Sequence, residues 1–106
     1  MGEMTLRQAL NAFRTVYLAF RNYASRRREE YINDLEDLID FLEKSGISRI
    51  GEIGTHQVDR YLAELDHRRL AGSTRKRKTI SIRSFLAFLF REHHISHDIS
   101  KKIISA

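Results

Sequence analysis

With 106 residues, 42% of them hydrophobic and 31% charged, the sequence has the composition of one globular domain over residues 1–106. It contains no cysteine, which excludes disulfides and thiolate metal sites, and no proline that would interrupt long helices. The formal net charge of +5 and the pI of about 9.9 favour a polyanionic partner. No apolar run approaches the roughly 20 residues that span a bilayer, and residues 1–10 lack a signal-peptide pattern, so we expect a cytoplasmic chain without membrane contact.

The first half of the chain predicts two helices. Thr5 and Gln8 form a capping-box pattern at the start of the first helix, and Ser25 is the predicted N-cap of the second. Gly46 suits the left-handed conformation that ends many helices. Apolar residues at steps of three and four predict one buried stripe on each helix. The stripes are Leu6, Leu10, Phe13, Tyr17, Phe20 and Ala24, then Tyr31, Leu35, Leu38, Ile39 and Leu42.

The second half predicts a loop, two more helices and a tail. The loop over residues 47–54 is held to the core by its three isoleucines. Thr55 is the predicted N-cap of the third helix, and Ser73 or Thr74 that of the fourth, which fades near residues 93–94. The inward-facing residues are Val58, Tyr61, Leu62 and Leu65, then Ile82, Phe85, Leu86 and Leu89, with Ile95, Ile99, Ile103 and Ile104 in the tail. The predicted fold is all-α: a compact bundle of four main helices plus a short C-terminal helical segment.

Charge is unevenly distributed along the chain. Residues 67–83 hold seven basic side chains and no acid, residues 29–43 hold seven acids and no base, and Arg26, Arg27 and Arg28 precede the acidic run. Both basic clusters lie at predicted helix starts, where the helix dipole opposes each cation by about 0.3–1 kcal/mol. Folding is therefore expected to gain nothing from this placement, whereas a bound polyanion would.

The fourth helix is predicted to present a cationic face. At about 100° per residue, Lys76, Ile80, Arg83 and Ala87 lie opposite the buried stripe, with Arg77 around the back. Arg75 and Lys78 project nearer the core but are long enough to reach outward. A DNA major groove admits one such helix. The candidate DNA-binding residues are Arg26, Arg27, Arg28, Ser73, Thr74, Arg75, Lys76, Arg77 and Arg83.

Three segments resemble the tyrosine recombinases (phage integrases). YINDLEDLIDFL at residues 31–42, followed by Gly46 and Ile47, resembles their Y-x-x-D-L-x-x-F-x-x-F-L…G-I stretch, and VDRYLAEL at 58–65 resembles their next helix. GST at 72–74, followed by IRSFLAFL at 82–89, is similar to their G-x-S-x-x-T…L-x-x-R-x-F-F-x-F-L block, with slight differences in spacing. Together these motifs cover about residues 5–100.

The resemblance implies an N-terminal SAM-like, core-binding domain, a bundle of four or five helices. In the family this domain is one half of a clamp around a recombination site, and its second and fourth helices approach successive DNA grooves. The implied partners are double-stranded DNA, a C-terminal catalytic domain and other protomers on DNA; the isolated domain is expected to be monomeric. Two positions depart from the family: Arg27 replaces a common Thr, and His97-Asp98-Ile99 stands where Asn-Pro is common. The family's catalytic Arg, Lys, His and Tyr have no counterpart in this chain.

Other chemistry is less well supported by the sequence. Tyr17, Tyr31 and Tyr61 fall on buried stripes, where packing is expected rather than nucleophilic catalysis. The histidines at 93, 94 and 97 have no Cys or acid placed to complete a metal shell, and no glycine motif for nucleotide phosphates is present. We therefore expect no enzyme activity, cofactor or metal in this domain. Two alternatives stay open: a helical protein-interaction module with a basic face, and a helix-turn-helix DNA-binding regulator.

Overall fold

The structure, a computed structural model, describes residues 4–103 and contains no extended strand over that range. Four α-helices are joined by short π- and 3-10-helical segments, as the all-α prediction expected. In chain order the elements are α1 (Leu6–Ala12), the π-helix η1 (Phe13–Leu18), α2 (Ser25–Lys44), the 3-10 helix η2 (Ile50–Glu52), α3 (Thr55–His67), α4 (Gly72–Arg91) and the 3-10 helix η3 (Ile99–Lys102).

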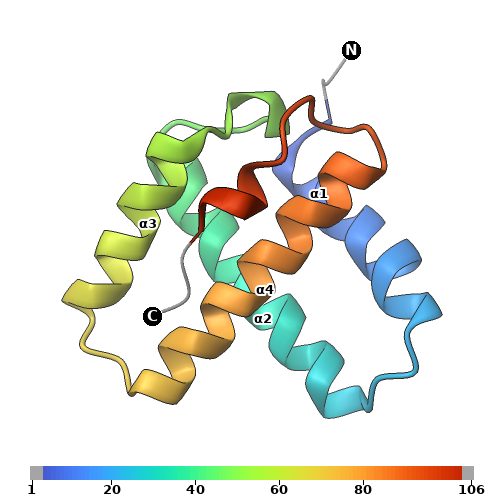
Figure 1. Cartoon of the computed structure of the whole chain (residues 1–106), viewed down its shortest axis with the longest axis horizontal. Helices are drawn as coiled ribbons and strands as arrows, with labels where there is room; N and C mark the ends of the chain where they lie inside the picture. The colour runs from blue at the N-terminus through green and yellow to red at the C-terminus, as the bar shows by residue number, and fades with distance from the viewer. Residues whose placement is uncertain (1–3, 104–106) are drawn as a thin grey trace.

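The two 20-residue helices, α2 and α4, cross at the centre of the molecule. In Figure 1, α3 lies on one side of this crossing, and α1 with η1 lies on the other. The starts of α2 and α4 both point to the lower edge of the view and diverge from the crossing. The predicted stripes of α2 and α4 form the centre of the core, where Leu35, Ile82 and Phe85 are fully buried.

The first helix departs from its predicted phase because a π-helix follows α1. In the π-helix each turn contains about one residue more than in an α-helix, so Leu18 rather than Tyr17 lies in register with the buried Phe13. Tyr17 is half-buried and stacks on Phe13 with ring centroids 4.6 Å apart. The prediction that Phe20 and Ala24 continue the buried stripe is wrong: Phe20 is 86% exposed, and Ala24 is exposed as well.

Helix starts also differ from the predicted caps at three positions. The capping box of Thr5 and Gln8 is present, and Gly46 has a φ of +90°, both as predicted. Ser25, Thr55 and the Ser73–Thr74 pair, however, lie inside their helices, because the N-caps of α2, α3 and α4 are Ala24, Gly54 and Ala71. The serine and threonine hydroxyls therefore do not close these helix ends.

The loop between α2 and α3 is fastened to both the core and the N-terminus. Ile50 and Ile53 are buried and Ile47 packs against the core, as predicted. Backbone hydrogen bonds from Leu6 N–H to the Ser48 carbonyl and from Ile50 N–H to the Met4 carbonyl tie the loop to the start of α1. In the tail, Ile99 and Ile103 are buried as predicted, while the expected contact of Ile104 lies outside the described residues. Within residues 4–103, no helix has both the length and the apolar character needed to span a membrane.

Candidate nucleic-acid interface

The starts of α2 and α4 enclose a cleft of about 500 Å³ that brings the two predicted basic clusters together. From α2 the cleft receives cationic side chains at one rim, and from α4 it receives a hydroxyl and cationic side chains at the other. Tyr31, Ile80 and the acidic Glu30 also line it. Its predicted DNA-binding residues are Arg26, Arg27, Ser73, Lys76 and Arg77. Two helices that begin 47 positions apart in the sequence thus form one cationic surface.

An exposed stripe continues from this cleft along the outer face of α4. Ser73, Lys76, Ile80 and Arg83 are exposed, Ala87 is half-buried, and Arg91 at the end of the helix is exposed. Their separations of three or four residues place them on one face of an α-helix. The predicted phase of α4, with Lys76, Ile80, Arg83 and Ala87 opposite the core, is therefore confirmed.

The other candidate residues lie apart from this surface, are half-buried or bind acids. Arg28 lines a separate hollow beside Arg14 and Leu18. The side chain of Thr74 is half-buried. Arg75 is turned toward α3, where its Nε donates to Asp66 Oδ1 over 2.7 Å. Arg77 borders the cleft, but its guanidinium binds an acid on α2.

A buried carboxylate at the helix crossing explains the position of Arg77. Asp34 of α2 is fully buried and accepts hydrogen bonds from Arg77 Nε (3.1 Å) and Nη2 (2.8 Å). The Ser81 hydroxyl donates to the same carboxylate at 2.8 Å, and Lys78 Nζ lies 3.4 Å away. Cations near the start of α4 are therefore paired with acids of α2. Arg75 is likewise paired, with Asp66 of α3, so these three cations have acidic partners within the fold. That folding gains nothing from them stays a prediction.

A second carboxylate, Asp37, joins α2 to both α3 and α4. Arg68 Nη1 donates to Asp37 Oδ2 at 2.7 Å, Tyr61 donates its hydroxyl proton to the same oxygen, and Lys78 Nζ lies 3.3 Å away. Burial by itself would raise the pKa of Asp37, but these three donors outweigh it and hold the pKa below its ordinary value. Burial and the bond to Asp37 raise the pKa of Tyr61 well above its ordinary range. Asp34 and Asp37 of α2 thus lie where this helix packs against α3 and α4.

The exposed cations of the surface lie beside tyrosine rings. The Arg27 guanidinium carbon is 4.8 Å from the Tyr23 ring centroid, and burial together with the neighbouring tyrosines raises the pKa of Tyr23 to about 12. The Arg21 and Arg91 guanidinium carbons lie 4.0 Å and 5.8 Å from the Tyr17 centroid. Sequence reasoning did not include Arg91 among the candidates. The signal was available, because Arg91 follows Ala87 by four residues on the same face of α4.

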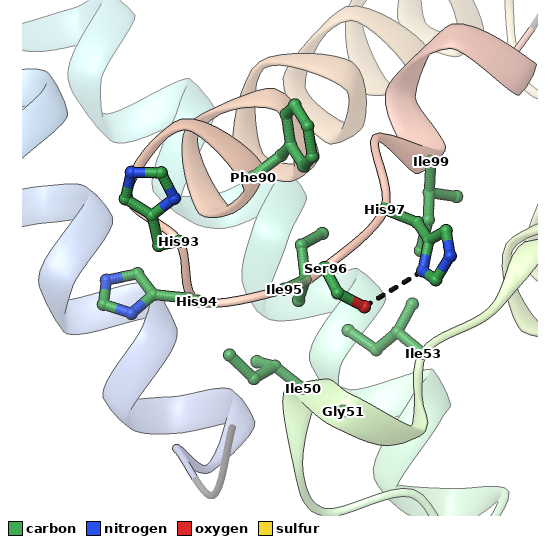
Figure 2. Close-up of a pocket in the computed structure, with 10 residues that line it drawn as sticks. All are labelled: Ile50, Gly51, Ile53, Phe90, His93, His94, Ile95, Ser96, His97 and Ile99. Carbon is green, nitrogen blue, oxygen red and sulfur yellow. Dashed lines mark hydrogen bonds between the residues drawn. The ribbon is translucent and has the colours of Figure 1, made fainter. Parts of the chain in front are cut away.

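A further hollow, of about 440 Å³, lies between η2 and the segment that follows α4 (Figure 2). It is lined by isoleucines and three histidines, and the rings of His93 and His94 lie at one end with His97 at the other. The Ser96 hydroxyl and His97 Nδ1 are 3.0 Å apart and share a hydrogen bond. Across residues 4–103, no group of three or more histidine or acidic side chains is arranged to hold a metal ion.

The fold and its basic face define an all-helical domain of the kind found at the N-terminus of phage integrases. The chain belongs to the family described as "Phage integrase, N-terminal SAM-like domain", whose model matches residues 4–93. An N-terminal domain of a phage integrase/site-specific recombinase from Haloarcula marismortui superposes with a TM-score of 0.89 over 98% of both chains, at 14% sequence identity. That likeness shows the fold.

Sequence relatives carry recombinase names. The chain is 37% identical to tyrosine recombinase XerC of Listeria welshimeri over 74% of its length, and 29% identical to XerC of Anoxybacillus flavithermus over 84%. It is 29% identical to tyrosine recombinase XerD of Bifidobacterium longum over 78%. The matched regions cover 26%, 30% and 27% of these relatives, so the chain spans about a quarter of the length of the proteins it resembles.

Proposed function

We propose that this chain binds double-stranded DNA as the N-terminal clamp half of a tyrosine site-specific recombinase, while a separate domain carries the catalytic residues. The proposed intracellular partners are a recombination site, that catalytic domain and other protomers on DNA. Family membership favours this function over a helix-turn-helix regulator or a basic protein-interaction module.

The observation that supports DNA binding best is that basic residues from the starts of both α2 and α4 line one cleft. Within residues 4–103, no ion pair involves Arg26, Arg27 or Lys76, although these cations border the same cleft. Their positive charges and the positive helix dipoles favour phosphate there. The proposed contacts are Arg26, Arg27, Ser73 and Lys76 with phosphate and Arg83 with a base edge. The proposed contacts do not include Arg28, which lies apart from this surface, or Thr74, which is half-buried. They also leave out Arg75 and Arg77, which bind acids.

The test is the salt dependence of binding to a 20-base-pair duplex, measured by fluorescence anisotropy. Neutralising about four to six phosphates predicts a slope of log K against log salt near −4 to −5, with affinity in the micromolar range or weaker for a random sequence. Lys76→Ala should reduce this slope by about one on every sequence.

Arg75→Ala is the matched control, because it removes one positive charge from the adjacent position. Arg75 already donates to Asp66, so its loss should change the slope by much less than one. Equal slope changes in the two variants would show that only overall charge matters. An absence of wild-type binding at 20 mM salt would contradict the proposed function.

A further inference from the structure

Another hollow, of about 400 Å³, lies beside Tyr17 on the same face of α4 as the cleft between the helix starts. Ile80 lines both spaces, so the hollow continues the cleft toward the end of α4. Its wall contains Tyr17 of η1 and Arg83, Ser84 and Arg91 of α4. None of the residues that line it is acidic.

Positive charge gathers around Tyr17. The guanidinium carbon of Arg21 lies 4.0 Å from the centre of the Tyr17 ring, and that of Arg91 lies 5.8 Å from it. The aromatic face attracts both cations, but it cannot neutralise them as a carboxylate would. Over the described range, neither Arg21 nor Arg91 forms an ion pair with an acid.

The Tyr17 hydroxyl is affected by Arg21 as well. Burial would raise the pKa of Tyr17, yet its contacts with Arg21 and Ser84 outweigh burial and lower the pKa. The neighbouring Tyr23 shows the opposite shift, upward, although it also lies near an arginine. Two guanidinium groups without a paired acid lie beside the Tyr17 ring, and a bound anion would relieve the repulsion between them.

We propose that the hollow beside Tyr17 is a second phosphodiester-binding subsite, formed by Arg91 and Arg21 on the aromatic platform of Tyr17. The inference rests on the proposed function, because its ligand is the backbone of the same duplex. Guanidinium groups suit phosphate through paired N–H donors. Lys76 and Arg91 are fifteen residues apart on α4, about 22 Å at 1.5 Å per residue. Along the duplex axis, that span corresponds to about six or seven base-pair steps at about 3.4 Å each, so one duplex reaches both subsites.

Binding of the 20-base-pair duplex by Arg91→Ala, Lys76→Ala and Arg60→Ala tests the inference. Arg60 is an exposed arginine on α3 that lines a different hollow, so its variant controls for the loss of one charge. Arg91→Ala and Lys76→Ala should each weaken binding about tenfold at 0.1 M salt and reduce the salt slope by about one, whereas Arg60→Ala should change binding less than twofold. Arg91→Lys should recover part of the affinity, because it restores the charge without the paired donors.

Tyrosine NMR with 13Cζ labels gives a readout that a purely structural role for Arg91 would not move. Addition of the duplex at neutral pH should shift the Tyr17 signal, assigned by its loss in Tyr17→Phe, and leave the buried Tyr61 signal unchanged. Inorganic phosphate at millimolar concentration should shift it less, since it lacks the contacts in the neighbouring cleft.

The outcomes separate the two proposals. If Lys76→Ala weakens binding but Arg91→Ala behaves like Arg60→Ala, or if the Tyr17 signal does not move with DNA, the second subsite is overturned and the proposed function stands. A Tyr17 shift as large with inorganic phosphate as with DNA would overturn the assignment to the duplex backbone. If the wild-type domain binds no duplex at 20 mM salt, both fail.

Discussion

Arg77 of α4 and Asp34 of α2 form a two-bond ion pair across the central helix crossing, with N–O distances of 3.1 and 2.8 Å. The Asp34 side chain is 0% exposed, whereas that of Arg77 is 41% exposed and borders the proposed DNA cleft. The Asp34 end of the pair therefore belongs to the core, and the Arg77 end lies at the edge of the proposed DNA cleft. Because Asp34 also accepts from Ser81, this carboxylate joins two side chains of α4 to α2.

Asp34→Ala should destabilise the domain by about 3 kcal/mol, because it leaves Arg77 and Lys78 without their buried acceptor. Urea denaturation measures this loss. Asp40→Ala on the same helix is the control: Asp40 pairs with Arg7 on the surface, and its loss should cost less than about 1 kcal/mol. Equal losses in the two variants would show that the crossing does not depend on Asp34.

Stability should fall in acid partly through Asp37. Its folded pKa lies below its ordinary value, so the bonds to Arg68 and Tyr61 stabilise the fold fully above about pH 4. The unfolded chain takes up this proton at a higher pH than the folded chain does. The contribution is therefore lost as the pH falls from about 4 through the folded pKa of Asp37. Urea midpoints between pH 6 and pH 2.5 should converge for wild type and Asp37→Asn. A constant gap between the two curves over this range would contradict the assignment.

The π-helix makes opposite predictions for two neighbouring apolar residues. Leu18→Ala should cost about 2–5 kcal/mol, because Leu18 is buried in register with Phe13. Phe20→Ala should change stability by less than about 0.5 kcal/mol, since the ring is largely exposed. Thermal unfolding of both variants decides between the π-helical register and an unbroken α-helix, which would reverse the order.

The centre of the core should be equally sensitive on its two main helices. Phe85→Ala and Leu35→Ala should each cost about 2–5 kcal/mol, because both side chains are fully buried. Phe85 also packs edge-on against Phe13 with centroids 5.6 Å apart, so its loss should disturb η1 as well. Unfolding midpoints that stay at the wild-type value would contradict this packing.

Arg83 is the residue expected to read a base. It is exposed in the middle of the α4 stripe and lines the hollow beside Tyr17. Arg83→Ala should weaken binding by about 1–3 kcal/mol on a site selected from a random duplex library, and by less on random DNA. Its unfolding free energy should change by less than about 1 kcal/mol. A variant that unfolds, yet binds normally when folded, would make Arg83 a structural residue.

The spacing of apolar residues along the chain was sufficient to predict the all-α architecture. Steps of three and four placed Leu35, Phe85 and their neighbours on buried stripes, and the same phase gave the exposed face of α4 from Lys76 to Ala87. These features depend on the spacing of apolar residues within one helix, which the sequence displays directly. The clusters of basic residues along the chain likewise predicted two basic helix starts.

Only the tertiary structure decided which charges are available to a ligand. Asp34 and Arg77 are 43 positions apart, and they meet because α4 packs across α2. Helical phase predicted that Lys76 faces outward and Arg75 lies nearer the core, but it did not predict that Arg75 and Arg77 bind acids of other helices. The π-helix was likewise decided by the tertiary structure. One added residue in a turn moves Leu18 inward and Phe20 outward without a change in composition. Helical periodicity is a property of neighbouring residues, whereas ion pairing and register depend on the packing of whole helices.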